Sequence, residues 1–228
     1  MSTLTNEIPK CLTKIGGIPL IQRQILSMSI AGLNEITIVT GYRSELIHTL
    51  GFPTRHNSQW SSTNMLQSLI CADDLLSTEP FFITYSDIVV GPNIIRDLVS
   101  LDKDLAIAYD PNWRHLWQLR MTDPLEDAET FRLNSNSSVA EIGKSPKNLN
   151  EIEGQYMGLI RMTPKAWTVL KHNLSSLPQS VQRSIQITQL LQLTIEKKSI
   201  DIFAVPNTEP WIEIDRPRDV EVAEKVLL

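Results

Sequence analysis

Short runs of β-branched and aromatic residues alternate along this chain with stretches whose apolar residues recur every three or four positions. The first pattern predicts strands and the second predicts amphipathic helices. Their alternation is typical of βαβ units in an α/β protein. Strands are predicted at residues 35–40, 81–90, 105–109, 155–160, 200–205 and 211–214, helices at 19–31, 44–50, 63–70, 164–171, 188–196, from Pro92 and from Pro217, and loops at 1–17 and 54–62.

The run Phe81–Val90 carries an acid, Asp87, behind its apolar residues. Such a run is typical of a buried strand in a parallel sheet with helices on both faces, and ligands of open α/β sheets bind where these strands end. An isolated aspartate there is commonly a solubilising or capping residue. However, residues 211–215 repeat the pattern and end on Asp215. Two such carboxylates can share one ion with oxygen-only ligation, so we predict an Mg²⁺ site formed by Asp87 and Asp215.

The composition of the chain argues against several classes of function. The 228 residues are 42% hydrophobic and 21% charged, with a formal net charge of −5 and no basic run, which argues against a nucleic-acid partner. Cys11 and Cys71 match no metal-binding spacing and suit a reducing compartment. No apolar run is long enough to span a bilayer, and no charged-then-apolar leader opens the chain. We therefore expect a cytoplasmic protein without a membrane span.

Motifs spread along nearly the whole chain resemble those of a known enzyme family. They are Leu4-Thr5-x-x-x-Pro9-Lys10, Gly17-x-Pro19-Leu20, Ala31-Gly32-Leu33, Val39-Thr40-Gly41-Tyr42, Thr63-Asn64-x-x-x-Ser68-Leu69, Ser86-Asp87 and Trp211-x-Glu213-Ile214-Asp215-x-x-x-Asp219. In this order they resemble the NTP-transferase family, which makes activated sugars and alcohols. Three further motifs look like its phosphocholine cytidylyltransferase branch, which also activates phosphonates and other small phosphorylated molecules: Asp123-Pro124-Leu125-x-Asp127-Ala128-Glu129, Glu141-Ile142-Gly143-Lys144 and Gly154-Gln155-Tyr156-Met157-Gly158-Leu159.

The resemblance implies a fold and a reaction. The fold is a single Rossmann-like, three-layer nucleotidyltransferase domain over residues 1–228, GT-A-like, with a mixed, mostly parallel sheet and a substrate-facing insertion at 111–160. The reaction moves a nucleotidyl group, CMP from CTP, to a small phosphorylated acceptor and releases pyrophosphate. Asp87 and Asp215 would hold Mg²⁺, and Lys10 would be a point charge on the triphosphate.

The remaining assignments follow the resemblance and have alternatives. Asn64 and Ser68 would bind the base and ribose, or they cap and decorate a helix. Lys144 would be a second cation, or an exposed lysine. The acceptor would be bound by Trp117, Arg120, Lys144, Tyr156 and Glu213. Trp113, Trp117 and Trp211 with Tyr156 would box a quaternary ammonium group, or, as we favour, pack the insertion against the sheet. Asp123, Glu126, Asp127 and Glu129 would attract an amino group, or form a solvated face.

Other functions stay open or are set aside. A glycosyltransferase would need Asp-x-Asp after strand 81–90, and Ser86 and Val89 do not supply it. A sugar-1-phosphate nucleotidyltransferase and a catalytically inactive nucleotide-binding homologue remain alternatives. Members of the family begin with an apolar strand and a Gly-x-Gly-x-Arg loop that cradles the triphosphate, whereas this chain begins at Met1-Ser2-Thr3-Leu4. We therefore expect an N-terminal truncation relative to the family and a low activity. Whether the chain forms a homo-oligomer is left open.

Overall fold

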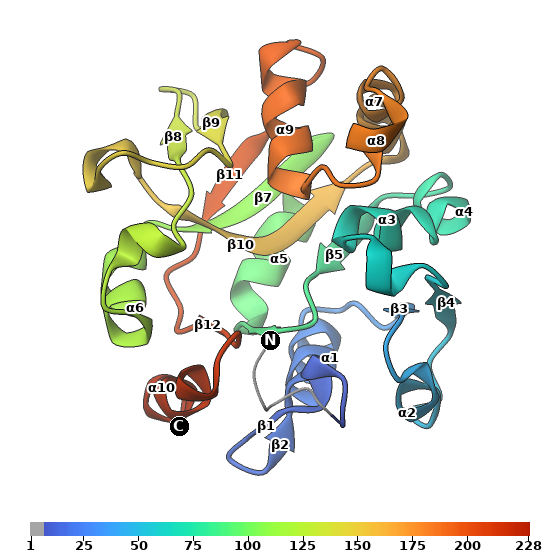
Figure 1. Ribbon diagram of the computed structural model, residues 1–228, viewed down its shortest axis with the longest axis vertical. Helices are drawn as coiled ribbons and strands as arrows, with labels where there is room; N and C mark the ends of the chain where they lie inside the picture. Colours follow the sequence, from blue (N-terminus) through green and yellow to red (C-terminus); the bar gives the residue numbers. More distant parts are fainter. Residues whose placement is uncertain (1–6) are drawn as a thin grey trace.

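A four-stranded mixed sheet is the centre of the computed structural model, which describes residues 7–228. Its strands lie in the order β11 (Phe203–Pro206), β7 (Leu105–Asp110), β10 (Gln155–Met162) and β5 (Phe81–Thr84) (Figure 1). β11 runs parallel to β7, whereas β10 runs antiparallel to both of its neighbours. The α/β class and the mixed sheet are confirmed, but the sheet is not mostly parallel, because β10 lies in its interior.

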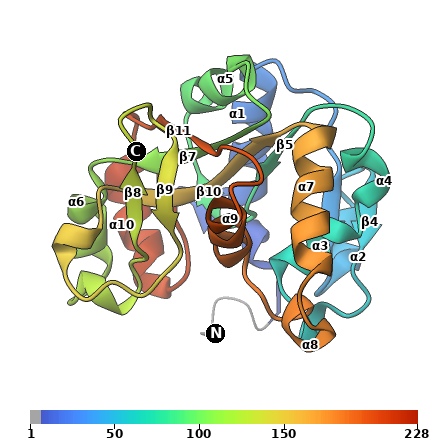
Figure 2. The ribbon, with the colours of Figure 1, turned by 90° about the horizontal axis from the view of Figure 1, so that it is seen from above.

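Helices cover both faces of this sheet, and β7 shows why. Successive side chains of a strand point to opposite faces. Leu105 and Ile107 enter the apolar cluster beneath α7 (Pro164–Ser175) and α9 (Ile187–Glu196). Ala106 and Ala108 enter the cluster beneath α1 (Leu20–Ile30) and α5 (Pro92–Ser100). Figure 2 shows the resulting three layers, with α1 and α5 on one side of the sheet and α7 and α9 on the other.

The run 81–90, predicted as one strand of a parallel sheet buried between helices, is divided in the structure. β5 is half-buried and, among the described residues, pairs with β10 alone, so it is an edge strand of this sheet. The chain then turns at Ser86 and Asp87 and continues as β6 (Ile88–Val89), which pairs with the distant β12 (Ile212–Glu213). The turn moves Asp87 out of the main sheet and next to the C-terminal part of the chain.

Two segments predicted as loops contain strands. The end of residues 1–17 contains β1 (Lys14–Ile15), which forms a hairpin with β2 (Ile18–Pro19), because Gly16 and Gly17 adopt the positive φ angles, 55° and 80°, that a tight hairpin turn requires. Part of 54–62 is β4 (Thr54–His56), which pairs in parallel with β3 (Ile38–Thr40). Leu4 and Thr5, quoted above for the resemblance, lie outside the described residues.

Residues 111–160 contain more regular structure than their polar composition suggested. α6 (Trp113–Arg120) was not predicted, although Trp113, Leu116 and Trp117 are spaced for one helix face, and all three are buried. The remaining elements are η2 (Lys10–Leu12), α2 (Ser44–His48), η3 (Trp60–Ser62), α3 (Met65–Ile70), α4 (Asp73–Leu76), η4 (Pro124–Glu126), β8 (Phe131–Leu133), β9 (Val139–Ile142), η5 (Leu149–Glu151), α8 (Gln179–Gln182) and α10 (Pro217–Leu227). Within residues 7–228, every helix is too short or too polar to cross a lipid bilayer.

Candidate active site

Pairing of β6 with β12 brings two distant acids together. Ile88 lies opposite Glu213 in this antiparallel pair, and the Ile214 N–H donates to the Asp87 carbonyl oxygen at 2.9 Å. Asp87 therefore lies beside Asp215, and one carboxylate oxygen from each of Asp87, Glu213 and Asp215 lies within 4.8 Å of the others. The predicted convergence of Asp87 and Asp215 is confirmed, and Glu213 joins them.

The turn that carries Asp87 is held from α1 by a residue that the sequence analysis missed. The amide of Gln24 donates to the carbonyl oxygens of Tyr85 (2.7 Å) and Ile88 (2.6 Å), on either side of Asp87. Gln24 is buried, and it interrupts the apolar face formed by Ile21, Ile25 and Met28 of the same helix. A polar residue within the buried face of an amphipathic helix was the available signal, since a buried amide needs partners.

Lys10 reaches the two acids from the N-terminal segment. Its Nζ lies 2.8 Å from Asp87 Oδ2 and 2.6 Å from Asp215 Oδ1. Burial by itself would lower the pKa of Lys10, but the two carboxylates outweigh burial and raise it. For Asp215, burial would raise the pKa, but the hydrogen bond and charge of Lys10 and the charge of Arg120 prevail and lower it. Lys10 is thus a stable ammonium ion that keeps Asp215 ionised.

Arg120, at the end of α6, is a second cation in the group. Its side chain is 0% exposed and contacts three carboxylates: Glu213 at 3.6 Å, Asp215 at 2.9 Å and Asp219 at 3.3 Å. Its guanidinium carbon lies 5.1 Å from the centre of the Trp117 ring. Arg120 was predicted to bind the acceptor, but the structure turns it inward as a buried counter-ion of the acids.

Asp219 fixes the backbone around Asp215. It stands at the third position of α10, and its Oδ2 accepts hydrogen bonds from the N–H groups of Asp215 and Arg216, both at 2.8 Å. These donors would otherwise be unpaired at the start of the helix. An acid three residues after a helix start was a readable capping signal, and the sequence analysis quoted Asp219 without giving it a role.

The acidic group is suited to a divalent cation. Four carboxyl groups, those of Asp87, Glu213, Asp215 and Asp219, face two cations. Asp87 Oδ1 is buried and has no hydrogen-bond partner. Burial and the charges of Asp87 and Asp215 raise the pKa of Glu213 to about 8. An excess of crowded carboxylates with an unpartnered oxygen fits Mg²⁺, which binds oxygen ligands.

An aromatic wall adjoins the acids. The Tyr85 and Tyr156 rings meet edge to face, with centroids 5.9 Å apart, and the Tyr156 hydroxyl is buried. Burial raises the pKa of Tyr85, and the nearby charges of Asp87, Glu129 and Glu213 raise it further. Gly158 has a φ of +75°, and a side-chain carbon there would lie 2.8 Å from the Tyr85 ring. Tyr85 and Tyr156 therefore lie near the acids and near Glu129.

The tryptophans are not arranged as a ligand box. Trp113, Trp117 and Trp211 are 1%, 3% and 4% exposed, and the cation beside Trp117 is the protein's own Arg120. Tyr156 pairs with Tyr85 instead of with this cluster. These tryptophans therefore form no ammonium box, and they pack in the core, as the favoured interpretation of the sequence predicted. Of the four acids considered for the acceptor, Glu129 is half-buried, whereas Asp123, Glu126 and Asp127 are solvated.

Three other predicted site residues have structural partners elsewhere. Asn64 caps α3 by accepting from Gln67 N and donates to the Ile185 carbonyl. Ser68 Oγ accepts from the Asn57 amide at 3.0 Å. Lys144 is exposed and pairs with Glu141 at 3.1 Å and Glu196 at 3.6 Å. Within residues 7–228, none of the three forms a hydrogen bond or ion pair with the acidic group, so their ligand-binding roles remain predictions.

Known proteins share both the sequence and the fold. The chain is 31% identical to a CTP:phosphoglutamine cytidylyltransferase from Campylobacter jejuni, over 96% of this chain and 92% of that protein. An inositol-1-phosphate CTP transferase from T. maritima is 17% identical, with a TM-score of 0.72 over 98% of this chain and 89% of its own. A CTP:phosphocholine cytidylyltransferase from Streptococcus pneumoniae is 19% identical, with a TM-score of 0.72 over 99% of this chain and 92% of its own. Residues 1–156 match the MobA-like NTP transferase domain. The chain therefore belongs to the MobA-like NTP transferase family and is a nucleotidyltransferase.

Proposed function

We propose that this protein transfers CMP from CTP to a small phosphorylated acceptor, and that phosphoglutamine is the first acceptor to test. The similarity to the CTP:phosphoglutamine cytidylyltransferase carries the proposal, because it extends over nearly the full length of both chains. In the reaction, a phosphate oxygen of the acceptor forms a bond to the α-phosphorus of CTP. The bond from that phosphorus to the α,β-bridging oxygen breaks, and pyrophosphate leaves with the bonding electrons.

The acidic group supplies the charges that this reaction needs. Asp87 and Asp215, with Glu213 beside them, would hold Mg²⁺, which when bound neutralises charge on the transferring phosphates. Lys10 would contact the triphosphate as a point charge. Arg120 acts through Asp215 and Glu213, whose carboxylates it orients from within the core. Asp219 positions the backbone of Asp215.

The acceptor would lie against the tyrosines. An amino or amide group could donate a hydrogen bond to Glu129, which is half-buried. The solvated acids Asp123, Glu126 and Asp127 contribute little here, because exposed charges are screened by water. A phosphorylated amide matches this lining better than a quaternary ammonium group, whose aromatic box is absent from the described residues.

Pyrophosphate release tests the proposal. The wild-type protein is assayed with CTP and Mg²⁺ against phosphoglutamine, phosphocholine, 2-aminoethylphosphonate and glucose 1-phosphate, and then with the other nucleoside triphosphates. We expect CTP and phosphoglutamine to give the highest rate, EDTA to abolish it, and Asp87→Asn to lower it by about 100-fold or more. Asp97→Asn, an exposed residue of α5, is the matched control and should keep the rate. Absence of release with every acceptor, or equal rates for both variants, would refute the proposed activity.

A further inference from the structure

Lys10 lies between Asp87 and Asp215, the two acids that are proposed to hold a metal ion. The ammonium nitrogen bridges the two acids, at 2.8 Å from Asp87 Oδ2 and 2.6 Å from Asp215 Oδ1. An ammonium ion and a divalent metal ion compete for the same oxygen lone pairs. The position between these two oxygens therefore holds a cation already.

Both carboxylate oxygens of Asp215 already have a cationic partner. Oδ1 accepts from Lys10, and Oδ2 accepts from Arg120 at 2.9 Å. Asp87 has one oxygen, Oδ1, without a partner. A metal ion bound by both acids can use that oxygen of Asp87, but on Asp215 it must share or replace a contact of Lys10 or Arg120.

The two cations differ in how firmly they are held. Arg120 has a side chain with 0% exposure, touches three carboxylates and packs on the Trp117 ring. Removing it would leave buried charges without partners, which is costly. Lys10 has a side chain with 22% exposure, and its two carboxylate partners are the ones that a metal ion would take. A lysine ammonium on its flexible stem can rotate into solvent, whereas the planar guanidinium of Arg120 is locked.

We propose that Lys10 is a displaceable counter-ion, which rests on the proposed function. In the metal-free protein its ammonium group neutralises Asp87 and Asp215, and on metal binding it moves outward and becomes available to the phosphates of the nucleotide. Arg120 stays in place as the buried counter-ion of Glu213, Asp215 and Asp219. Because Lys10 leaves one site and enters the other, metal and nucleotide each favour binding of the other. Release of the Lys10 ammonium group from Asp87 and Asp215 thus links metal binding to binding of the triphosphate.

Amine labelling followed by mass spectrometry tests the displacement directly. The wild-type protein is treated with an acetylating reagent alone, with saturating Mg²⁺, and with Mg²⁺ and CTP. Since the released lysine is a minor population without metal, on the order of a tenth or less, Mg²⁺ should accelerate labelling of Lys10 about tenfold. CTP should then protect Lys10 again. Lys14, an exposed lysine of β1 four positions away, is the internal control and should react equally in all three samples.

Calorimetry of Mg²⁺ binding on the same samples distinguishes failure of the displacement from failure of the proposed activity. If Mg²⁺ binds and the labelling of Lys10 is unchanged or slower, Lys10 stays between the acids and the displacement is refuted, while the proposed activity stands. If Mg²⁺ does not bind, both are refuted. In Lys10→Met, we expect Mg²⁺ to bind about tenfold more tightly without nucleotide and CTP to bind more weakly with Mg²⁺. A variant in which both affinities fall would show that Lys10 has only a structural role, and Lys14→Met should change neither.

Discussion

Replacement of Asp219 by alanine should destabilise the protein and loosen the acidic group. Asp219 is 0% exposed and accepts three hydrogen bonds, from the N–H groups of Asp215 and Arg216 and from the Arg120 guanidinium. Two backbone bonds are worth roughly 1 kcal/mol each, and the bond from a charged donor about 1.5–3 kcal/mol. Their loss predicts a decrease of roughly 3–5 kcal/mol in the free energy of unfolding, a large part of the roughly 5–15 kcal/mol available to a folded protein.

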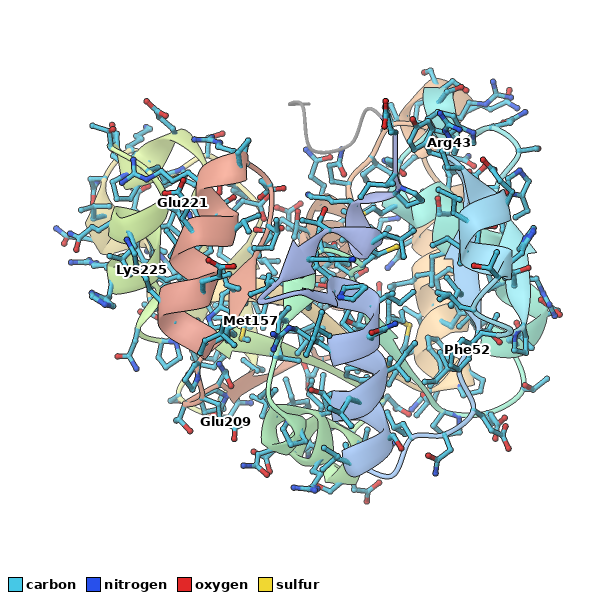
Figure 3. All side chains as sticks on the ribbon, turned by 90° about the horizontal axis from the view of Figure 1, so that it is seen from below. Arg43, Phe52, Met157, Glu209, Glu221 and Lys225 are labelled. Carbon is cyan, nitrogen blue, oxygen red and sulfur yellow. The ribbon has the colours of Figure 1, made fainter. Side chains whose placement is uncertain are left out.

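Urea denaturation followed by circular dichroism measures this loss. Thermal unfolding should show a fall in Tm of about 10 °C, since for a chain of this size each kcal/mol shifts Tm by roughly 2–4 °C. Glu221→Ala is the matched control, because Glu221 is exposed on the same helix, α10, which lies beside the β1–β2 hairpin (Figure 3), and its loss should change stability by less than about 0.5 kcal/mol. Asp219→Asn keeps an acceptor oxygen and should fall between the two. If Asp219→Ala lowers the free energy of unfolding no more than Glu221→Ala does, the three hydrogen bonds do not stabilise this part of the fold.

Substitutions at Glu213 and at two glycines provide further tests. The folded protein raises the pKa of Glu213 from 4.5 to about 8, so it binds this proton more tightly than the unfolded chain does. Stability without metal should therefore fall as pH rises from about 4.5 to 8, and Glu213→Gln should flatten that fall in urea midpoints measured across this range; an unchanged slope would contradict the assignment. Gly158→Ala and Gly17→Ala should each lose about 1–2 kcal/mol, because both glycines have positive φ angles, 75° and 80°. Gly158→Ala should lose more stability, since its new carbon would lie 2.8 Å from the Tyr85 ring, whereas Gly17 has open space around it. Equal losses of stability in urea denaturation would show that the Tyr85 ring moves aside without cost.

Elements with a strong local pattern were predicted well. α1 and α9 begin and end close to the predicted positions, and α7 and α10 begin at the predicted prolines, because apolar spacing and prolines are local signals. β7 and β10 were recognised from their β-branched and apolar runs. The short pieces β1, β2 and β4 were not, because two or three residues carry too little periodicity to be distinguished from loop. α6 was missed because charged and polar residues mask its apolar face.

Within the site, the identity of the acids could be predicted but their partners could not. Asp87 and Asp215 follow strand-like runs, and this position identified them before any coordinates. That Arg120 lies buried among three carboxylates depends on α6 packing beside α10, a contact between segments nearly a hundred residues apart. The same packing buries Trp117, so a candidate ligand box became part of the core.

The sequence by itself determined most of the longer helices and strands, which of their faces are apolar, and which acids follow the strands. These properties are local, because a side chain's preference for water or for a strand acts at its own position. The tertiary structure alone decided that β10 enters the interior of the sheet, that β6 pairs with β12, and that Lys10 bridges Asp87 and Asp215. A periodic pattern shows that a face is buried but not what covers it. Lys10 is 77 positions from Asp87 and 205 positions from Asp215 in the sequence, so its two ion pairs exist only once the sheet and its helices have packed.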